Sequence, residues 1–126
     1  MKWNIDESLP IWPQLYSRLS AGIAARRFPP GSRLPSVREL AADAGVNPNT
    51  MQRALTELEM KGLIVTNRTA GRNVCMDQMI INAVRQEEAE RKIGNMLKSM
   101  EELGYRDEEI RRMIEDVLQD RRGEEG

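Results

Sequence analysis

Residues 34–62 hold the signatures of two short helices and the turn between them: LPSVRELAADAGVNPNTMQRALTELEMKG. Ser36 and Glu39 stand three residues apart, the spacing of a capping box, in which each side chain satisfies a free backbone N–H at the helix start. The first helix is therefore expected to begin just after Ser36. Gly45 is suited to end it, because glycine adopts a left-handed conformation at little cost. One apolar stripe runs along this helix, made of Val37, Leu40, Ala41 and Ala44.

A second helix follows directly. Asn47 is a favoured N-cap residue and Pro48 a favoured first helical residue, so this helix is expected to start there. It should continue to Met60 or Lys61, where Gly62 stops it. Two short helices joined by a tight, glycine-containing turn form a helix-turn-helix arrangement.

The second helix has one apolar face and one polar face. Met51, Ala54, Leu55 and Leu58 recur at helical spacing, which leaves the opposite side polar. Asn and Gln can pair with adenine, Arg with guanine, and Thr can approach a thymine methyl group or a phosphate. The alternative is an ordinary solvated helix surface, but the preceding helix and the local basic excess favour base recognition. The outward residues are Asn49, Gln52, Arg53 and Thr56.

Upstream, residues 10–27 predict an amphipathic helix of about four turns. Its apolar stripe repeats every four residues, Pro13 lies in its first turn, and Arg26 and Arg27 close it. The alternation in residues 2–5 predicts a short additional strand. The stripe consists of Ile11, Leu15, Leu19 and Ile23.

Downstream, the pattern changes from helical to extended. Residues 63–66 and 73–76 form two β-branched runs around a polar turn containing glycine, which predicts a hairpin. A hairpin after a recognition helix is a wing, and cations at its tip can approach phosphates or the minor groove. Arg68 and Arg72 are expected at this tip, although arginines there could instead keep a sheet edge soluble.

From Asp77 onward the chain changes character again. Residues 79–103 contain no proline and predict a long helix with a coiled-coil-like seam, and residues after Tyr105 predict a final amphipathic helix, with residues 121–126 fraying. Two such helices cannot enclose a core, so a second copy is the economical partner; packing back onto residues 1–76 is the alternative. The predicted dimerisation residues are Ala89, Ile93, Met96, Met100, Leu103, Ile110, Met113, Ile114, Val117 and Leu118.

Charge separates the same two parts. The 126 residues carry a net charge of −1, but residues 1–76 contain ten Lys or Arg against six Asp or Glu, and residues 77–126 contain nine against fourteen. Such asymmetry indicates a polyanion-binding part joined to another part.

Composition removes several classes of protein. The chain has no histidine and a single cysteine, Cys75, which excludes a His-based nucleophile system, a Cys/His zinc site and an intramolecular disulfide. We therefore expect no enzyme, no metal and no cofactor. No apolar run approaches the length of a membrane span, so a cytoplasmic setting without membrane contact is expected.

The quoted residues resemble the GntR family of bacterial transcriptional regulators. The resemblance covers about residues 8–76 and rests on the runs PIWPQL (10–15), PGSRLPSVRELA (30–41), GVNPNT (45–50), RA (53–54) and LEMKGLI (58–64). It implies a winged helix-turn-helix that binds double-stranded operator DNA as a homodimer. By motif position, the resemblance implies DNA contacts from Arg33, Ser36, Arg38, Asn47, Asn49, Thr50, Gln52, Arg53, Arg68, Gly71 and Arg72.

Two features refine this resemblance. The wing departs from the family's usual Gly-x-Gly-Thr-Phe-Val pattern, because Thr69 stands at the first glycine and Asn73 at the aromatic position. The short segment after the wing resembles the YtrA-type subfamily, whose two-helix tail serves dimerisation and whose genes often accompany ABC transporters.

The expected fold is therefore mainly α with a small β-hairpin: a winged helix-turn-helix over residues 1–76 and a two-helix dimerisation domain over residues 77–126. The expected function is a sequence-specific repressor that binds an inverted repeat as a homodimer. The sequence names no small-molecule effector. The competing hypothesis is a protein-interaction module whose acidic tail docks on another protein.

Overall fold

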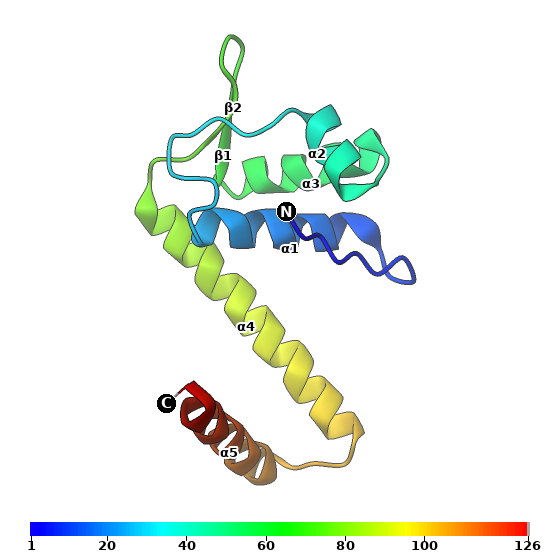
Figure 1. Ribbon diagram of the computed structural model, residues 1–126, viewed down its shortest axis with the longest axis vertical. Coiled ribbons are helices and arrows are strands. Elements are labelled where there is room, and N and C mark those ends of the chain that lie inside the picture. Colours follow the sequence, from blue (N-terminus) through cyan, green and yellow to red (C-terminus); the bar gives the residue numbers. More distant parts are fainter. Residues whose placement is uncertain (126) are drawn as a thin grey trace. The chain divides into compact units, whose positions relative to one another are not determined.

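The computed structural model describes residues 1–125 and divides the chain into two compact units, Met1–Glu88 and a second unit that begins at Ala89. Five helices and one two-stranded antiparallel hairpin make up the described residues (Figure 1). The predicted fold class, mainly α with a small hairpin, is confirmed. None of the described helices is long and apolar enough to cross a membrane.

The first unit contains three complete helices: α1 (Ile11–Ala24), α2 (Val37–Ala44) and α3 (Pro48–Met60). Helix α3 packs against both α1 and α2, and all four residues of its apolar face are fully buried. The first unit thus has one continuous core. Its buried members are Trp3, Leu15, Tyr16, Leu19, Ile23, Leu34, Leu40, Ala41, Met51, Ala54, Leu55, Leu58, Leu63, Ile64, Val74, Cys75, Ile81 and Val84.

Local side-chain caps define the helix-turn-helix. The Ser36 hydroxyl accepts from the backbone N–H of Glu39 at 3.1 Å, and the Glu39 carboxylate accepts from the N–H of Ser36 at 3.3 Å, so the predicted capping box is formed. Gly45 is left-handed, with φ +71°. Asn47 Oδ1 accepts from the N–H of Asn49 at 2.8 Å and caps α3 as predicted.

The predicted hairpin is confirmed, with its second strand starting earlier than expected. Strand β1 (Ile64–Asn67) pairs with β2 (Gly71–Val74), whereas the sequence placed the second run at residues 73–76. Strand β2 has a second partner, because the Leu34 N–H donates to the Arg72 carbonyl and the Val74 N–H to the Ser32 carbonyl, both at 2.8 Å. This pairing extends the strand, so Arg72 lies within β2 and not at the tip.

The strand expected over residues 2–5 is absent. Asn4 has φ +48°, which interrupts an extended run, and Trp3 turns into the core. The indole Nε1–H of Trp3 donates to Asp43 Oδ2 at 2.7 Å, so this segment packs against α2. The prediction was wrong because a buried tryptophan with a polar partner outweighs a short alternating pattern.

Helix α4 (Gln78–Glu102) begins inside the first unit. Ile81 and Val84 are buried members of its core, and Lys61 Nζ of the loop after α3 pairs with Glu87 Oε1 at 2.9 Å. That hydrogen bond raises the pKa of the Lys61 ammonium group. The compact unit therefore ends at Glu88, beyond the boundary predicted after residue 76, because the first turns of α4 carry core residues.

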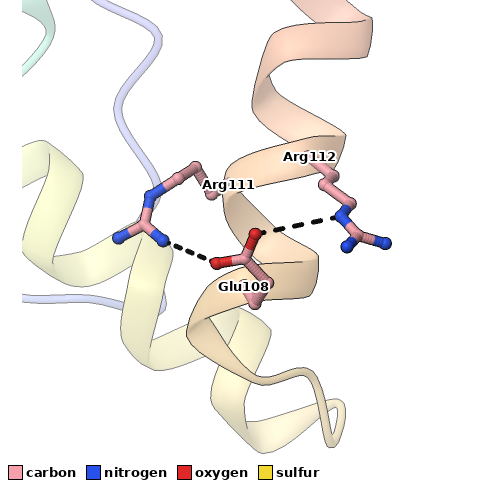
Figure 2. A network of polar contacts seen from close by, with 3 residues as sticks. All are labelled: Glu108, Arg111 and Arg112. Atoms are coloured by element: carbon pink, nitrogen blue, oxygen red, sulfur yellow. Dashed lines mark hydrogen bonds and ion pairs between the residues drawn. The ribbon is translucent and has the colours of Figure 1, made fainter.

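The second unit contains the rest of α4 and α5 (Asp107–Glu125). At the end of α4 the Tyr105 N–H donates to the Met100 carbonyl at 3.2 Å and the Gly104 N–H to the Glu101 carbonyl at 2.9 Å, a Schellman turn. Glu108 pairs with Arg111 at 2.8 Å and with Arg112 at 3.9 Å (Figure 2), two exposed contacts that add little stability.

The tail expected to fray is helical through Glu125; Gly126 lies outside the described residues. Arg122 in the last turn offsets the negative end of the helix dipole, which favours this longer helix.

Replacing Ser36 by alanine tests the capping box. The change removes the hydroxyl that accepts from Glu39 and should lower the free energy of unfolding by about 1 kcal/mol. Thermal and urea unfolding measure this change. Ser36→Asp keeps an accepting oxygen and serves as the control, with near wild-type stability. Equal stability of Ser36→Ala and Ser36→Asp would contradict a working cap.

Candidate nucleic-acid interface

The polar face of α3 points to solvent because its opposite face is fully buried. Asn49, Gln52, Arg53 and Thr56 are all exposed, as the helical spacing predicted. Thr50 is half-buried and lines a separate hollow next to Ile5 and Ile11. Asn47 is exposed, but its side-chain oxygen is engaged in the cap of α3. Helix α3 therefore presents all four predicted side chains of its polar face to solvent.

Arg53 is held in place by an aromatic ring. Its Cζ lies 4.8 Å from the centroid of the Trp12 ring, which comes from the first turn of α1. A guanidinium group over an indole face is attracted by the ring quadrupole, and the contact restricts the rotamers of a long side chain. Arg53 is thus both exposed and held in one orientation. Sequence spacing did not predict this contact.

A hollow joins the N-terminus of α2 to the hairpin, and its lining contains five of the eleven predicted DNA-binding residues. The N-terminus of a helix presents free N–H groups and a partial positive charge, a setting that favours phosphate. Three arginines line the hollow beside this helix end. The five predicted residues are Arg33, Ser36, Arg38, Gly71 and Arg72, and the lining is completed by Leu34, Pro35 and Val37.

Arg72 ties the hairpin to α3. Its Nη2 donates to Gln52 Oε1 at 3.2 Å, and its Nε is buried without a hydrogen-bond partner. The side chain is half-buried, so it does not extend freely from the hairpin as the sequence suggested. No local pattern could reveal this contact, because it joins positions twenty residues apart on different elements.

The hairpin tip carries Arg68 alone among the predicted arginines. The Asn67 side-chain oxygen accepts from both the N–H and the hydroxyl of Thr69 at 3.0 Å, a local turn that leaves Arg68 exposed. Arg68 therefore extends from the turn in the manner expected of a wing cation.

Gly71 allows the hairpin to close on Arg33. It has φ +72°, and a Cβ built there would lie 3.2 Å from Arg33 Nε. The left-handed backbone favours glycine, and a Cβ here would make the Arg33 side chain shift by a few tenths of an ångström.

The arginines around the polar face of α3 carry positive charge that no neighbouring carboxylate in residues 1–125 pairs with. Within the part of the chain that the structure describes, no ion pair involves Arg33, Arg38, Arg53, Arg68 or Arg72. No cluster of His, Cys, Asp or Glu among the described residues could hold a metal ion. Burial raises the pKa of the Cys75 thiol, which makes it a poor nucleophile. The arrangement suits binding of an extended polyanion.

Comparison with known sequences places these features in context. Residues 13–74 match the family described as bacterial regulatory proteins, gntR family. The HTH-type transcriptional regulator YhcF of Bacillus subtilis is 33% identical over 107 residues, which cover 85% of this chain and 88% of that protein. The HTH-type transcriptional repressor YtrA of Bacillus subtilis is 42% identical over 64 residues, which cover 51% of this chain and 49% of that protein.

Solved structures show the same fold. A GntR family transcriptional regulator from Listeria monocytogenes matches with a TM-score of 0.77 and 33% identity, over 89% of this chain and 98% of that chain. AraR(DBD) in complex with operator ORX1 matches with a TM-score of 0.51 and 25% identity, over 60% of this chain and 92% of that chain.

Replacing Gly71 by alanine tests the closure of the hairpin on Arg33. The left-handed backbone alone should cost about 1–2 kcal/mol, and the new methyl group must displace the Arg33 side chain. Urea unfolding measures the loss. Gly94→Ala is the control, since a Cβ at Gly94 meets nothing within 4 Å and alanine favours helix. A Gly71→Ala variant as stable as the wild type would contradict the geometry described.

Proposed function

Because the chain belongs to the GntR family of bacterial regulatory proteins, we propose that it is a transcriptional repressor that binds an inverted-repeat operator as a homodimer. Members of this family are DNA-binding transcriptional regulators and not enzymes. The finer claims of operator symmetry and dimerisation are supported by the surfaces of the two units, and repression by the similarity to a repressor.

One observation carries the proposal most strongly: five arginines without ion pairs gather around the exposed face of α3, the N-terminus of α2 and the hairpin. Each phosphate neutralised on DNA releases condensed counterions, which is the main source of sequence-independent affinity. Because the whole protein has a net charge of −1, this positive charge is confined to one surface. We assign it to the DNA backbone and major groove.

The roles divide by position. Helix α3 enters the major groove, where Asn49, Gln52 and Arg53 reach base edges. Arg33, Ser36 and Arg38 hold a phosphate at the N-terminus of α2. Arg68 at the hairpin tip contacts the backbone next to the minor groove. Asn47 caps α3 and Thr50 is half-buried. Both residues position α3 and lie near the phosphates.

The second unit supplies the dimer contact. Its helices expose large apolar side chains that they do not cover for one another, and burying such a stripe is the usual drive for helical association. A symmetric pair would bury the same stripe twice. The exposed members are Ile93, Met96, Leu103, Met113, Ile114, Val117 and Leu118; of the other predicted residues Ala89 is exposed, Met100 is half-buried and Ile110 is buried.

Repression requires only that the dimer occupy a site that RNA polymerase also needs. The similarity to the repressor YtrA supports this mode, and control of an ABC-transporter operon forms part of the same proposal. Such a regulator acts in the cytoplasm, where the chromosome lies.

Selection from random duplexes tests the operator. We expect an inverted repeat whose half-sites lie about one helical turn apart, roughly 34–36 Å. Affinity should fall steeply with salt, and Arg38→Ala with Arg68→Ala should flatten the salt dependence by about one slope unit for each phosphate that is no longer neutralised. Arg18→Ala, an exposed arginine of α1, is the control and should leave the slope unchanged. A selection without any palindrome would count against the proposal.

Charge placed on the apolar stripe tests the dimer. Ile114→Glu buries a carboxylate in the proposed interface, so the species in solution should change from twice the chain mass of 14.4 kDa to a single chain. Light scattering after size exclusion measures the mass. Gln119→Glu adds the same charge on the opposite side of α5 and should remain dimeric. A wild-type monomer with full operator affinity would rule out the dimer.

A further inference from the structure

We propose that Arg72 of the hairpin sets which base Gln52 of α3 can recognise, and that the pair selects guanine. This inference rests on the proposed DNA-binding function and deepens it to one base pair. It differs from the sequence expectation, in which a glutamine on this face pairs with adenine through both ends of its amide.

The orientation of the Gln52 amide follows from its partner. Arginine carries only donors, so the atom 3.2 Å from Arg72 Nη2 must be the amide oxygen. One lone pair of the oxygen that would accept from the N6 amino group of adenine is therefore taken by Arg72, and a positive charge lies beside the other.

The nitrogen end of the amide lies next to Thr56. Thr56 donates its hydroxyl proton to the Gln52 carbonyl at 2.9 Å, which leaves Thr56 Oγ1 able to accept from Gln52 Nε2 at 3.5 Å. This last contact is long and weak. It directs one amide proton along the helix and leaves the other free to point away from the protein. Gln52 consequently presents a donor to DNA, and the guanidinium group beside its oxygen makes the approach of a second donor, such as an adenine amino group, less favourable.

The backbone of Arg72 is held in place by its neighbours. Its backbone carbonyl accepts from Leu34, it pairs with Thr66 across the hairpin, and its Nε is buried. The guanidinium group thus approaches α3 from a fixed strand. Its remaining N–H groups add donors beside the Gln52 amide.

A surface dominated by hydrogen-bond donors and positive charge matches a base edge that offers only acceptors. In the major groove guanine presents two acceptors, N7 and O6. Adenine presents one acceptor and one donor, and cytosine presents a donor. Thymine has a single acceptor beside a methyl group. Guanine is therefore the base that the Gln52–Arg72 pair selects.

The experiment uses the full-length protein and four versions of the selected operator that differ at one base pair. Gln52→Ala first locates that pair as the position where base preference is lost. The wild type should prefer guanine there by about tenfold, and Arg72→Ala should free the amide oxygen and shift the preference toward adenine by a similar factor. Arg72→Lys keeps a donor and should retain guanine.

Arg68→Ala is the matched control, because Arg68 is an exposed arginine of the same hairpin without the Gln52 contact. It should weaken binding to all four duplexes about equally. Thermal unfolding of each variant verifies that the fold is intact, and Arg72→Met, which retains the length of the side chain, repeats the test with less change in packing.

The possible failures are distinguishable. A wild-type preference for adenine at this pair, an unchanged guanine preference in Arg72→Ala, or a Gln52→Ala variant with every preference intact would overturn the inference while leaving the operator and the proposed function standing. Failure of the wild type to discriminate between operator and random DNA would overturn the proposed function itself.

Discussion

The complete burial of one face of α3 is the constraint on which the rest of the structure depends. Met51, Ala54, Leu55 and Leu58 have no exposed surface, and α1 and α2 pack against the helix that carries them. Rotation of α3 by even a quarter turn would expose these side chains and bury polar ones, at a cost of several kcal/mol. The burial therefore decides which residues face outward. Because this burial fixes the orientation of α3, the arginines of the hairpin and of the N-terminus of α2 lie beside a polar face that does not rotate.

Charge distribution gives the two parts of the chain different properties. The basic surplus of residues 1–76 is small, four charges, and the acidic surplus of residues 77–126 is five. A modest basic surface attracts DNA without holding every sequence tightly, and an acidic tail reduces nonspecific attraction further. Discrimination then depends on contacts to base edges, where the fixed orientation of side chains such as Gln52 and Arg53 has its effect.

Local sequence rules predicted the helices, the caps and the hairpin because each depends on residues a few positions apart. Ser36 with Glu39, Gly45, and Asn47 with Pro48 act within one turn, and the structure has them as expected. The contacts that these rules did not predict join distant positions: Trp3 with Asp43, Arg53 with Trp12, and Arg72 with Gln52. Periodicity reports which face of an element is buried, but it does not report which side chains of two elements meet. The exposure of the polar face of α3 was therefore predictable from spacing, while the orientation of its side chains required the packed structure.

Protection of guanine N7 from dimethyl sulfate in an operator complex tests most directly whether the outward face of α3 reads the major groove. N7 lies in the major groove, so a dimer with α3 inserted twice should protect two groups of guanines about 10–10.5 base pairs apart on one face of the duplex. Full reactivity of every guanine N7 at saturating protein, or a single protected group, would contradict this account of α3.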